Sequence, residues 1–507
     1  MGEQIVQTIT DVNGAINEAV WGWPALILLG FTGVLMTLLT KFFQLSHFGY
    51  WMRHTIGAIF KDRNVVKHTK DKSISQFQSL CTALAATVGT GNIVGVATAI
   101  AIGGPGAVFW MWLIAFFGMM TNYSENVLGI LYRRKNEKGE WSGGAMYYLR
   151  DGLGAKKHCK ALGAILAVLF SVFCLLASFG IGNMSQVNSM VTNVNHAFGI
   201  PKIAVGIFLF LAVGLVIIGG IKRIANLTEK LVPFMVILYF LGTIIIILMH
   251  VDRVPAVFVS IFQGAFALKS AAGGIVGSGI ALAMKMGMKR GVFSNEAGLG
   301  SSVMVHSSSN VKEPVRQGMW GIFEVFADTI IVCTLTALTV LSSGDVDLVT
   351  GQLSASGAAV EPSALVSHAF EMTFGKAGAI FIAVAILLFA YSTVLGWSHY
   401  GTKAFEYLFG TKRVLIYRII FVVIVLAGSV LEAQLAWDIS DTFNGLMMLP
   451  NLIGVVVLSP QVMKCTKNFV DRHMRHKAEK PMLSMIPEIQ KMQEESLDAE
   501  DEADLDH

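Results

Sequence analysis

Long uncharged apolar runs are the feature that most restricts how this chain can fold. The runs 23–40, 203–221 and 377–402 contain no Asp, Glu, Lys or Arg, and each reaches the roughly 18 residues that a membrane-spanning helix needs. Only 14% of the residues are charged, whereas soluble domains carry about a quarter. A single buried core could explain one such run, but not a series of them. The pattern therefore predicts an all-α polytopic membrane protein.

The apolar segments predict eleven transmembrane helices. We expect them at 21–44, 76–102, 106–131, 161–192, 202–220, 230–250, 256–287 (interrupted), 318–341, 377–403, 414–432 and 441–462.

Lys and Arg residues predict the orientation of these helices, because cytoplasmic loops carry an excess of both. Basic residues concentrate in alternate connections, at 53–72, 133–160, 222–230, 285–316 and 403–413. The opposite connections hold only Lys202, Arg253 and Lys376. We therefore expect the N-terminus outside and the C-terminus in the cytoplasm. The net charge of +4 is spread over short loops, so nucleic-acid binding is not expected.

The spans divide the chain into five expected regions. Residues 1–45 form an N-terminal extracellular segment with one extra transmembrane helix, and residues 46–75 form a basic cytoplasmic loop. Residues 76–250 and 251–464 each hold five helices, and residues 465–507 form an acidic cytoplasmic tail expected to be disordered. Because five is odd, the second group begins on the opposite side of the membrane. This arrangement is a 5+5 inverted repeat.

Glycine-rich breaks interrupt the first helix of each five-helix group. One break lies at Gly89-Thr90-Gly91, and the other includes Gly273 and Gly274. Glycine is a poor helix former, and backbone groups freed inside a bilayer need protein, water, an ion or a substrate to satisfy them. Paired breaks in matching positions indicate a transporter binding site. The alternative for either break alone is close helix packing, as in Gly91-x-x-x-Gly95.

Three sequence motifs resemble the sodium:alanine symporter family, also called alanine or glycine:cation symporters. They are Ala-Leu-Ala-Ala-Thr-Val-Gly-Thr-Gly-Asn-Ile-Val-Gly at 83–95, Arg-Gly-Val-Phe-Ser-Asn-Glu-Ala-Gly-Leu-Gly at 290–300 and Tyr-Ser-Thr-Val-Leu-Gly-Trp at 391–397. The similarity covers roughly residues 21–464. It implies a LeuT-like core and sodium-coupled transport of alanine or glycine. Residues 85–93 and 389–393 also match short motifs in the first and eighth core helices of LeuT.

The resemblance implies specific ligands. For sodium these are the carbonyls of Ala85, Val88 and Ala390 and the hydroxyl of Thr393, with Ser392 as a possible substitute because Val394 stands where a serine is expected. Asn92 is also expected among the substrate-binding residues, and it matches a position at a second sodium site in LeuT. The substrate carboxylate would meet amides near Gly89, Thr90 and Gly91. The ammonium group would meet carbonyls near Thr87 and Ile275, beside Gly273 and Gly274.

The same division of tasks follows from helix chemistry. Sodium is a hard cation that prefers oxygen ligands, and a half-helix C-terminus presents bare carbonyls. The next half-helix N-terminus presents N–H groups to a carboxylate.

Phe179 and Trp397 are candidate walls for a methyl-sized side chain, with ordinary packing as the alternative. For Glu324 and Asp328, a structural ion pair with a cytoplasmic Arg competes with a coupling role.

These inferences predict a sodium-coupled importer of a small neutral amino acid in the plasma membrane, acting by alternating access. The alternatives are a proton- or sodium-coupled transporter of another neutral amino acid or small solute, and a passive channel. No nucleophile–base pair or metal cluster with recognisable spacing suggests an enzyme. We expect sodium and the amino acid as the ligands, the lipid bilayer as the surroundings, and a monomer.

Overall fold

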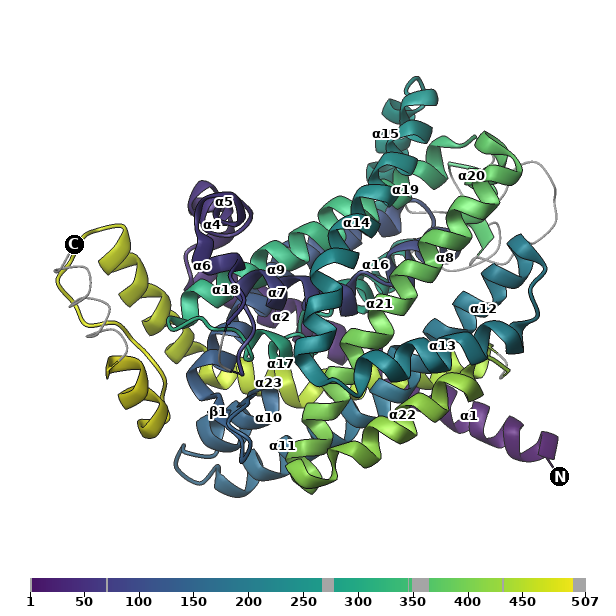
Figure 1. Ribbon diagram of the computed structural model, residues 1–507. Coiled ribbons are helices and arrows are strands. Elements are labelled where there is room, and N and C mark those ends of the chain that lie inside the picture. The colour runs from purple at the N-terminus through teal and green to yellow at the C-terminus, as the bar shows by residue number, and fades with distance from the viewer. Residues whose placement is uncertain are drawn as a thin grey trace.

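Helices form most of the protein, with one short β-hairpin among them. The computed structural model (Figure 1) describes residues 2–69, 72–266, 278–344, 346–348, 364–430 and 433–495. Strands β1 (Arg134–Lys135) and β2 (Trp141–Ser142) pair antiparallel between two helices. The predicted all-α class is confirmed.

The helices follow one another with short connections. The N-terminal part contains α1 (Gly2–Val20), α2 (Trp23–Leu39), α3 (Phe43–Ser46), α4 (Phe48–His54), α5 (Ile56–Lys61) and α6 (Arg63–Val66). The next part contains α7 (Gln76–Thr87), η1 (Gly91–Gly95), α8 (Val96–Gly103), α9 (Gly106–Tyr132), α10 (Ala145–Tyr147), η2 (Tyr148–Leu153), α11 (Lys160–Phe179), η3 (Gly180–Met184), α12 (Ser185–Phe198), α13 (Lys202–Ile217) and α14 (Gly220–Met249).

The remaining helices follow the same pattern. They are α15 (Val254–Phe266), α16 (Ser278–Asn295), α17 (Val303–His306), α18 (Pro314–Val325), η4 (Phe326–Cys333), α19 (Thr334–Ser342), α20 (Leu365–Phe374), α21 (Lys376–Phe409), η6 (Thr411–Arg413), α22 (Val414–Gly428) and α23 (Ala433–His473). Here η1 to η4 are π-helical turns and η6 is a 3₁₀ turn.

Every predicted membrane segment overlaps at least one helix. Among the described residues, seven helices are long and apolar enough to cross a membrane, or eight when α7 and η1–α8 count as one broken span. The predicted segments 202–220 and 256–287 hold the shorter apolar helices α13 and α15. The polytopic class is therefore confirmed, while the count of eleven crossings, the orientation and the inverted repeat remain predictions.

The first core span is broken where the glycines predict it. Helix α7 begins with a capping box in which Ser75 and Gln78 satisfy each other's backbone N–H groups. It ends at Thr87, and the chain continues through η1 and α8 at an angle of 52° to α7. Gly104, with a φ of 74°, and Pro105 then turn the chain into α9.

Apolar side chains cover both the interior and much of the outer surface. Large hydrophobic residues are exposed along the outer faces of α13, α14 and α22, including Phe208, Leu215, Phe234, Ile237 and Ile419. Contiguous apolar surface of this kind is unusual in a soluble monomer. A surrounding bilayer removes its cost, in agreement with the membrane assignment.

The C-terminal segment differs from the expected disordered tail. Helix α23 continues past residue 464 to His473. Beyond it, the Ser484 hydroxyl and the Met485 N–H donate to the Leu131 carbonyl at 3.1 and 2.8 Å, which fixes this stretch against the end of α9. Acidic composition alone did not show these backbone contacts, and residues 496–507 lie outside the described part.

Candidate functional site

Backbone hydrogen bonds change partners at the break after α7. The Val88 N–H still donates to the Leu84 carbonyl at 2.8 Å, as in an α-helix. The Gly89 N–H donates instead to the Thr87 carbonyl and to Asn92 Oδ1, both at 2.9 Å. The Asn92 N–H donates to the Gly89 carbonyl at 3.3 Å.

This change of partners releases carbonyl oxygens. In a continuing α-helix, the N–H groups of Gly89 and Asn92 would donate to the carbonyls of Ala85 and Val88. Both N–H groups donate elsewhere, so the two carbonyls lose their usual donors. Ala85 and Val88 are almost completely buried, and buried carbonyls need another partner. These are the carbonyls that the family resemblance assigns to sodium.

Helix α21 packs directly against the break. A Cβ at Gly89 would overlap Thr393 Oγ1, and a Cβ at Gly396 would meet Ala86 Cβ at 2.6 Å. The Thr393 hydroxyl therefore lies beside the turn that releases the carbonyls, and it donates within its own helix to the Phe389 carbonyl at 3.0 Å. The structure thus brings the expected sodium ligands of the first and eighth core helices together.

Ser392 has different neighbours. Its hydroxyl donates to the Phe389 carbonyl at 2.8 Å and lies 3.4 Å from Met235 Sδ of α14. Val394 is fully buried and offers no polar atom. Between the two hydroxyls of this turn, the contacts favour Thr393.

The second half of the chain closes the other side of the break. A Cβ at Gly91 would meet Phe293 Cδ1 at 3.2 Å and Ser294 Cα at 3.4 Å, so the end of α16 packs on η1. The predicted residues Gly273, Gly274 and Ile275 lie outside the described residues.

A polar cluster surrounds Asn92. Its Nδ2 donates to Asp328 Oδ1 at 2.6 Å, and the other carboxylate oxygen of Asp328 accepts from Ser294 Oγ and Thr329 Oγ1, both at 2.8 Å. Asp328 lies in the π-helical turn η4 and is fully buried. A carboxylate with neutral partners here differs from the alternative of a pair with a cytoplasmic Arg.

Glu324 also has neutral or weakly basic partners rather than an Arg. Its Oε2 lies 2.9 Å from His306 Nε2 and accepts from Asn122 Nδ2 at 3.2 Å. Both Glu324 and His306 are fully buried. Among the described residues, the partner of Glu324 is therefore His306 of α17 rather than the Arg of the ion-pair alternative.

Trp397 is held from two sides. Its Nε1 donates to Glu296 Oε1 at 2.7 Å, and a Cβ at Gly182 of η3 would meet its ring carbon Cγ at 2.6 Å. Glu296 adopts a φ of 57°, which is uncommon for a residue with a side chain. The side chain of Trp397 is completely buried.

Phe179 packs mainly in an aromatic cluster. Its ring centroid lies 5.5 Å from Tyr417 and 6.3 Å from Phe421, both on α22. Unlike Trp397 it is only partly buried. These contacts agree with the packing alternative for Phe179, and a role as a wall stays a prediction.

The sequence did not predict the contact of Gln186. Its Oε1 accepts from the Thr90 hydroxyl at 3.0 Å and lies 3.4 Å from the Thr90 nitrogen. The available signal was a glutamine in a long apolar segment, since polar residues in membrane helices are costly and commonly functional. The π-helical turns η1, η3 and η4 also went unpredicted, although such turns are frequent at functional sites.

The candidate site is closed to solvent. Thr87, Thr90, Asn92, Ala390 and Thr393 are buried, each with at most 3% of its surface exposed. A site of buried oxygen ligands around a broken membrane helix is typical of the occluded centre of a secondary transporter.

The fold and the site therefore define a polytopic transporter built around a broken membrane helix. Residues 6–483 match the sodium:alanine symporter family, and the chain belongs to this family of sodium-coupled amino-acid symporters. Its relatives are multi-pass plasma-membrane transporters rather than enzymes.

Curated relatives agree with this assignment, and one solved structure has a similar fold. The chain is 43% identical to the sodium/alanine symporter AgcS of Methanococcus maripaludis, over 90% of this chain and 96% of that protein. It is 35% identical to the probable sodium/glutamine symporter GlnT of Bacillus subtilis, over 91% of each. The crystal structure of MhsT in complex with L-phenylalanine covers 79% of this chain and 99% of that one, with a TM-score of 0.51 and 12% identity. This likeness concerns the fold alone.

Proposed function

We propose that this protein imports alanine or glycine together with sodium by alternating access, with its N-terminus outside and its C-terminus in the cytoplasm. The observation that carries the proposal is the break after Thr87, where the carbonyls of Ala85 and Val88 lose their helical donors beside the Thr393 hydroxyl. Neutral oxygens of this kind suit sodium.

One sodium ion is held by the carbonyls of Ala85, Val88 and Ala390 and by the Thr393 hydroxyl. The contact of Gly89 with Thr393 Oγ1 supports this set, and the bond of Ser392 toward Met235 argues against Ser392 as a ligand. With a valine at 394, the site has one hydroxyl fewer than the LeuT pattern. We place a second sodium beside Asn92, whose Nδ2 donates to the buried carboxyl group of Asp328.

The amino acid binds across the same break. The half-helix that starts after Thr90 has the positive end of its dipole at the break, where it favours a carboxylate. Gln186 Oε1 occupies this position at the Thr90 hydroxyl, so a substrate carboxylate takes the place of a weak neutral acceptor. The Thr87 carbonyl and the segment near Ile275 receive the ammonium group.

The position of Trp397 favours a transported amino acid with a small side chain. The Trp397 indole is hydrogen-bonded to Glu296 and packs closely against Gly182. Because both contacts restrict its movement, a larger substrate side chain cannot readily displace it. The relatedness to both AgcS and GlnT makes glutamine the substrate to test against alanine. A Trp397→Ala variant that accepts larger amino acids, with Phe179→Ala as its comparison, separates a wall from simple packing.

Uptake by proteoliposomes tests the proposal. We expect accumulation of labelled alanine that requires an inward sodium gradient, is competed by glycine and is poorly competed by glutamine. One sodium ion moving down 100 mV releases about 2.3 kcal/mol, enough for about fifty-fold accumulation. Uptake that follows a proton gradient without sodium contradicts the coupling ion. Uptake that never rises above equilibrium supports a channel instead.

A further inference from the structure

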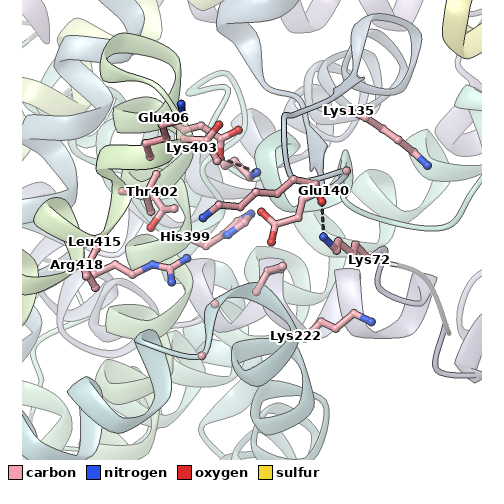
Figure 2. A pocket seen from close by; sticks show the side chains of 18 residues that line it. Lys72, Lys135, Glu140, Lys222, His399, Thr402, Lys403, Glu406, Leu415 and Arg418 are labelled. Atoms are coloured by element: carbon pink, nitrogen blue, oxygen red, sulfur yellow. Dashed lines mark hydrogen bonds and ion pairs between the residues drawn. The ribbon is translucent and has the colours of Figure 1, made fainter.

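A large basic pocket lies at the end of the bundle where α21 is followed by α22 (Figure 2). Its volume is about 900 Å³. The walls come from the segment before α7, the β1–β2 turn, the connection between α13 and α14, the end of α21 and the start of α22. None of the residues assigned above to sodium or the amino acid lines it, so it is separate from the transport site.

The lining is strongly positive. Seven cationic side chains line the pocket together with two carboxylates; the cations are Lys72, Lys135, Lys138, Lys222, Lys403, Lys412 and Arg418, and the acids are Glu140 and Glu406. Glu406 is already saturated, since it accepts from Lys403 at 3.1 Å, from Ser142 at 2.5 Å and from Asn136 at 3.1 Å. Excess positive charge of this kind favours a bound anion.

Two buried nitrogens of the lining have no hydrogen-bond partner. They are His399 Nε2 and Arg418 Nε, and His399 is only 3% exposed. The Arg418 Nη1 donates to the Ile218 carbonyl at 3.2 Å, which fixes the guanidinium at the pocket wall. Arg418 Nε always carries a proton, and a buried donor of this kind without a partner costs free energy. A phosphate oxygen satisfies such a donor through a charge-assisted hydrogen bond, the kind that arginine makes well.

An apolar surface begins at the rim of this pocket. Leu415 lines the pocket and is also 55% exposed. Ile419, on the next turn of α22, is exposed as well. Leu215 of the neighbouring helix α13 and Ile218, directly after that helix, are also exposed. Helices α13 and α22 pack together, with Gly214 against Val422. A soluble phosphate would use only the basic part, whereas a phospholipid would use both surfaces.

We propose that this pocket binds the phosphate headgroup of an anionic phospholipid whose acyl chains lie along the exposed faces of α13 and α22. Basic pockets between membrane helices are suited to such headgroups. The bound headgroup connects the β1–β2 turn and the α13–α14 connection to α21, the helix that carries Thr393 and Trp397. The lipid therefore stabilises one arrangement of α21 relative to the first half of the chain.

The test compares two charge-matched double variants of the full-length protein. Lys138→Gln with Lys412→Gln removes two exposed cations from the pocket. Lys156→Gln with Lys157→Gln removes two exposed cations that do not line it. Native mass spectrometry with phosphatidylglycerol and phosphatidylcholine measures retention of each lipid, without sodium or amino acid present. We expect at least a tenfold loss of phosphatidylglycerol affinity in the pocket variant and less than a twofold change in the control.

Further arms separate the sources of phosphate and the risk of misfolding. Glycerol phosphate that competes at the same concentration as the lipid overturns the assignment to a phospholipid. Equal losses in the two double variants, or equal retention of phosphatidylcholine, overturn the site. Arg418→Lys keeps the charge but removes Nε, so it should weaken phosphatidylglycerol binding while the thermal transition in detergent stays near that of the parent. Because binding is read without transport, failure here leaves the proposed symport untouched.

Discussion

Replacing Thr393 by valine tests the sodium site most directly. Valine keeps the branched shape and exchanges Oγ1 for a methyl group beside Gly89. The intrahelical bond to the Phe389 carbonyl at 3.0 Å is lost, which costs about 0.5–1.5 kcal/mol of folding free energy as for other neutral hydrogen bonds. In the proposed ligand set the sodium ion loses one oxygen ligand, and an interaction with a charged group is worth about 1.5–3 kcal/mol.

These magnitudes predict a selective effect on sodium. A loss of about 1.5–3 kcal/mol corresponds to a rise of about 10- to 150-fold in the sodium concentration for half-maximal alanine uptake. The assay is the initial rate of labelled alanine uptake in proteoliposomes across a sodium titration. With lithium in place of sodium, the cation concentration for half-maximal alanine uptake should rise by the same factor or more.

Thr243→Val provides the matched control. Thr243 is fully buried on α14 and donates within its helix to the Tyr239 carbonyl at 2.9 Å, so its loss has the same folding cost but touches no proposed ligand. We expect its sodium dependence to match that of the parent. If Thr393→Val and Thr243→Val both stay within threefold of the parent in sodium dependence, Thr393 is not a sodium ligand.

Three further changes probe other contacts. Gly89→Ala places a methyl group on Thr393 Oγ1 and should raise the half-saturating sodium concentration at least tenfold. Gly49→Ala, which has open space around it, is the control and should leave that concentration unchanged. Equal behaviour of the two variants in the same uptake assay refutes the close contact. Glu296→Ala removes the acceptor of the Trp397 indole at 2.7 Å and should let glutamine compete with labelled alanine, an interpretation that fails if selectivity stays unchanged. Burial raises the pKa of Glu313, but the His473 hydrogen bond and the Arg472 charge together lower it by more than burial raises it. The net pKa therefore lies below the ordinary value of 4.5. Its contribution to stability is therefore present at neutral pH and lost as the pH falls below about 4.5, and Glu313→Gln should flatten this part of a melting-temperature profile; an unchanged profile contradicts it.

The apolar runs and the glycines were sufficient to predict the broken first helix. Spanning segments depend on composition over many residues, and the break depends on local backbone preference at Gly89 and Gly91. Both are properties of a continuous stretch of chain. The proximity of Gly89 to Thr393 came instead from the resemblance, because nothing in either stretch alone brings them together.

The partners of the buried carboxylates could not be predicted in the same way. Asp328 and Glu324 lie one helical turn apart, which suggested a shared cationic partner on one face. The π-helical turn η4 around Asp328 changes that spacing, and the two residues bind Asn92 and His306 separately. Such contacts depend on how distant helices pack, so the sequence carried only the signal that charges in membrane spans have a role.

Three consecutive residues at the C-terminal end of α16 and directly after it contact both the polar cluster around Asn92 and the Trp397 side chain. Ser294 donates to Asp328, Asn295 donates to Thr329 at 2.9 Å, and Glu296 accepts from Trp397. Asp328 in turn accepts from Asn92 at the break. A shift of η4 or of the break therefore displaces residues 294–296, and Glu296 of this segment binds the Trp397 indole. Coupled transport requires that the ion and the substrate stabilise the same conformation. Because Ser294 and Glu296 are only two residues apart, a change in position at Asp328 is transmitted through this segment to Trp397 of α21.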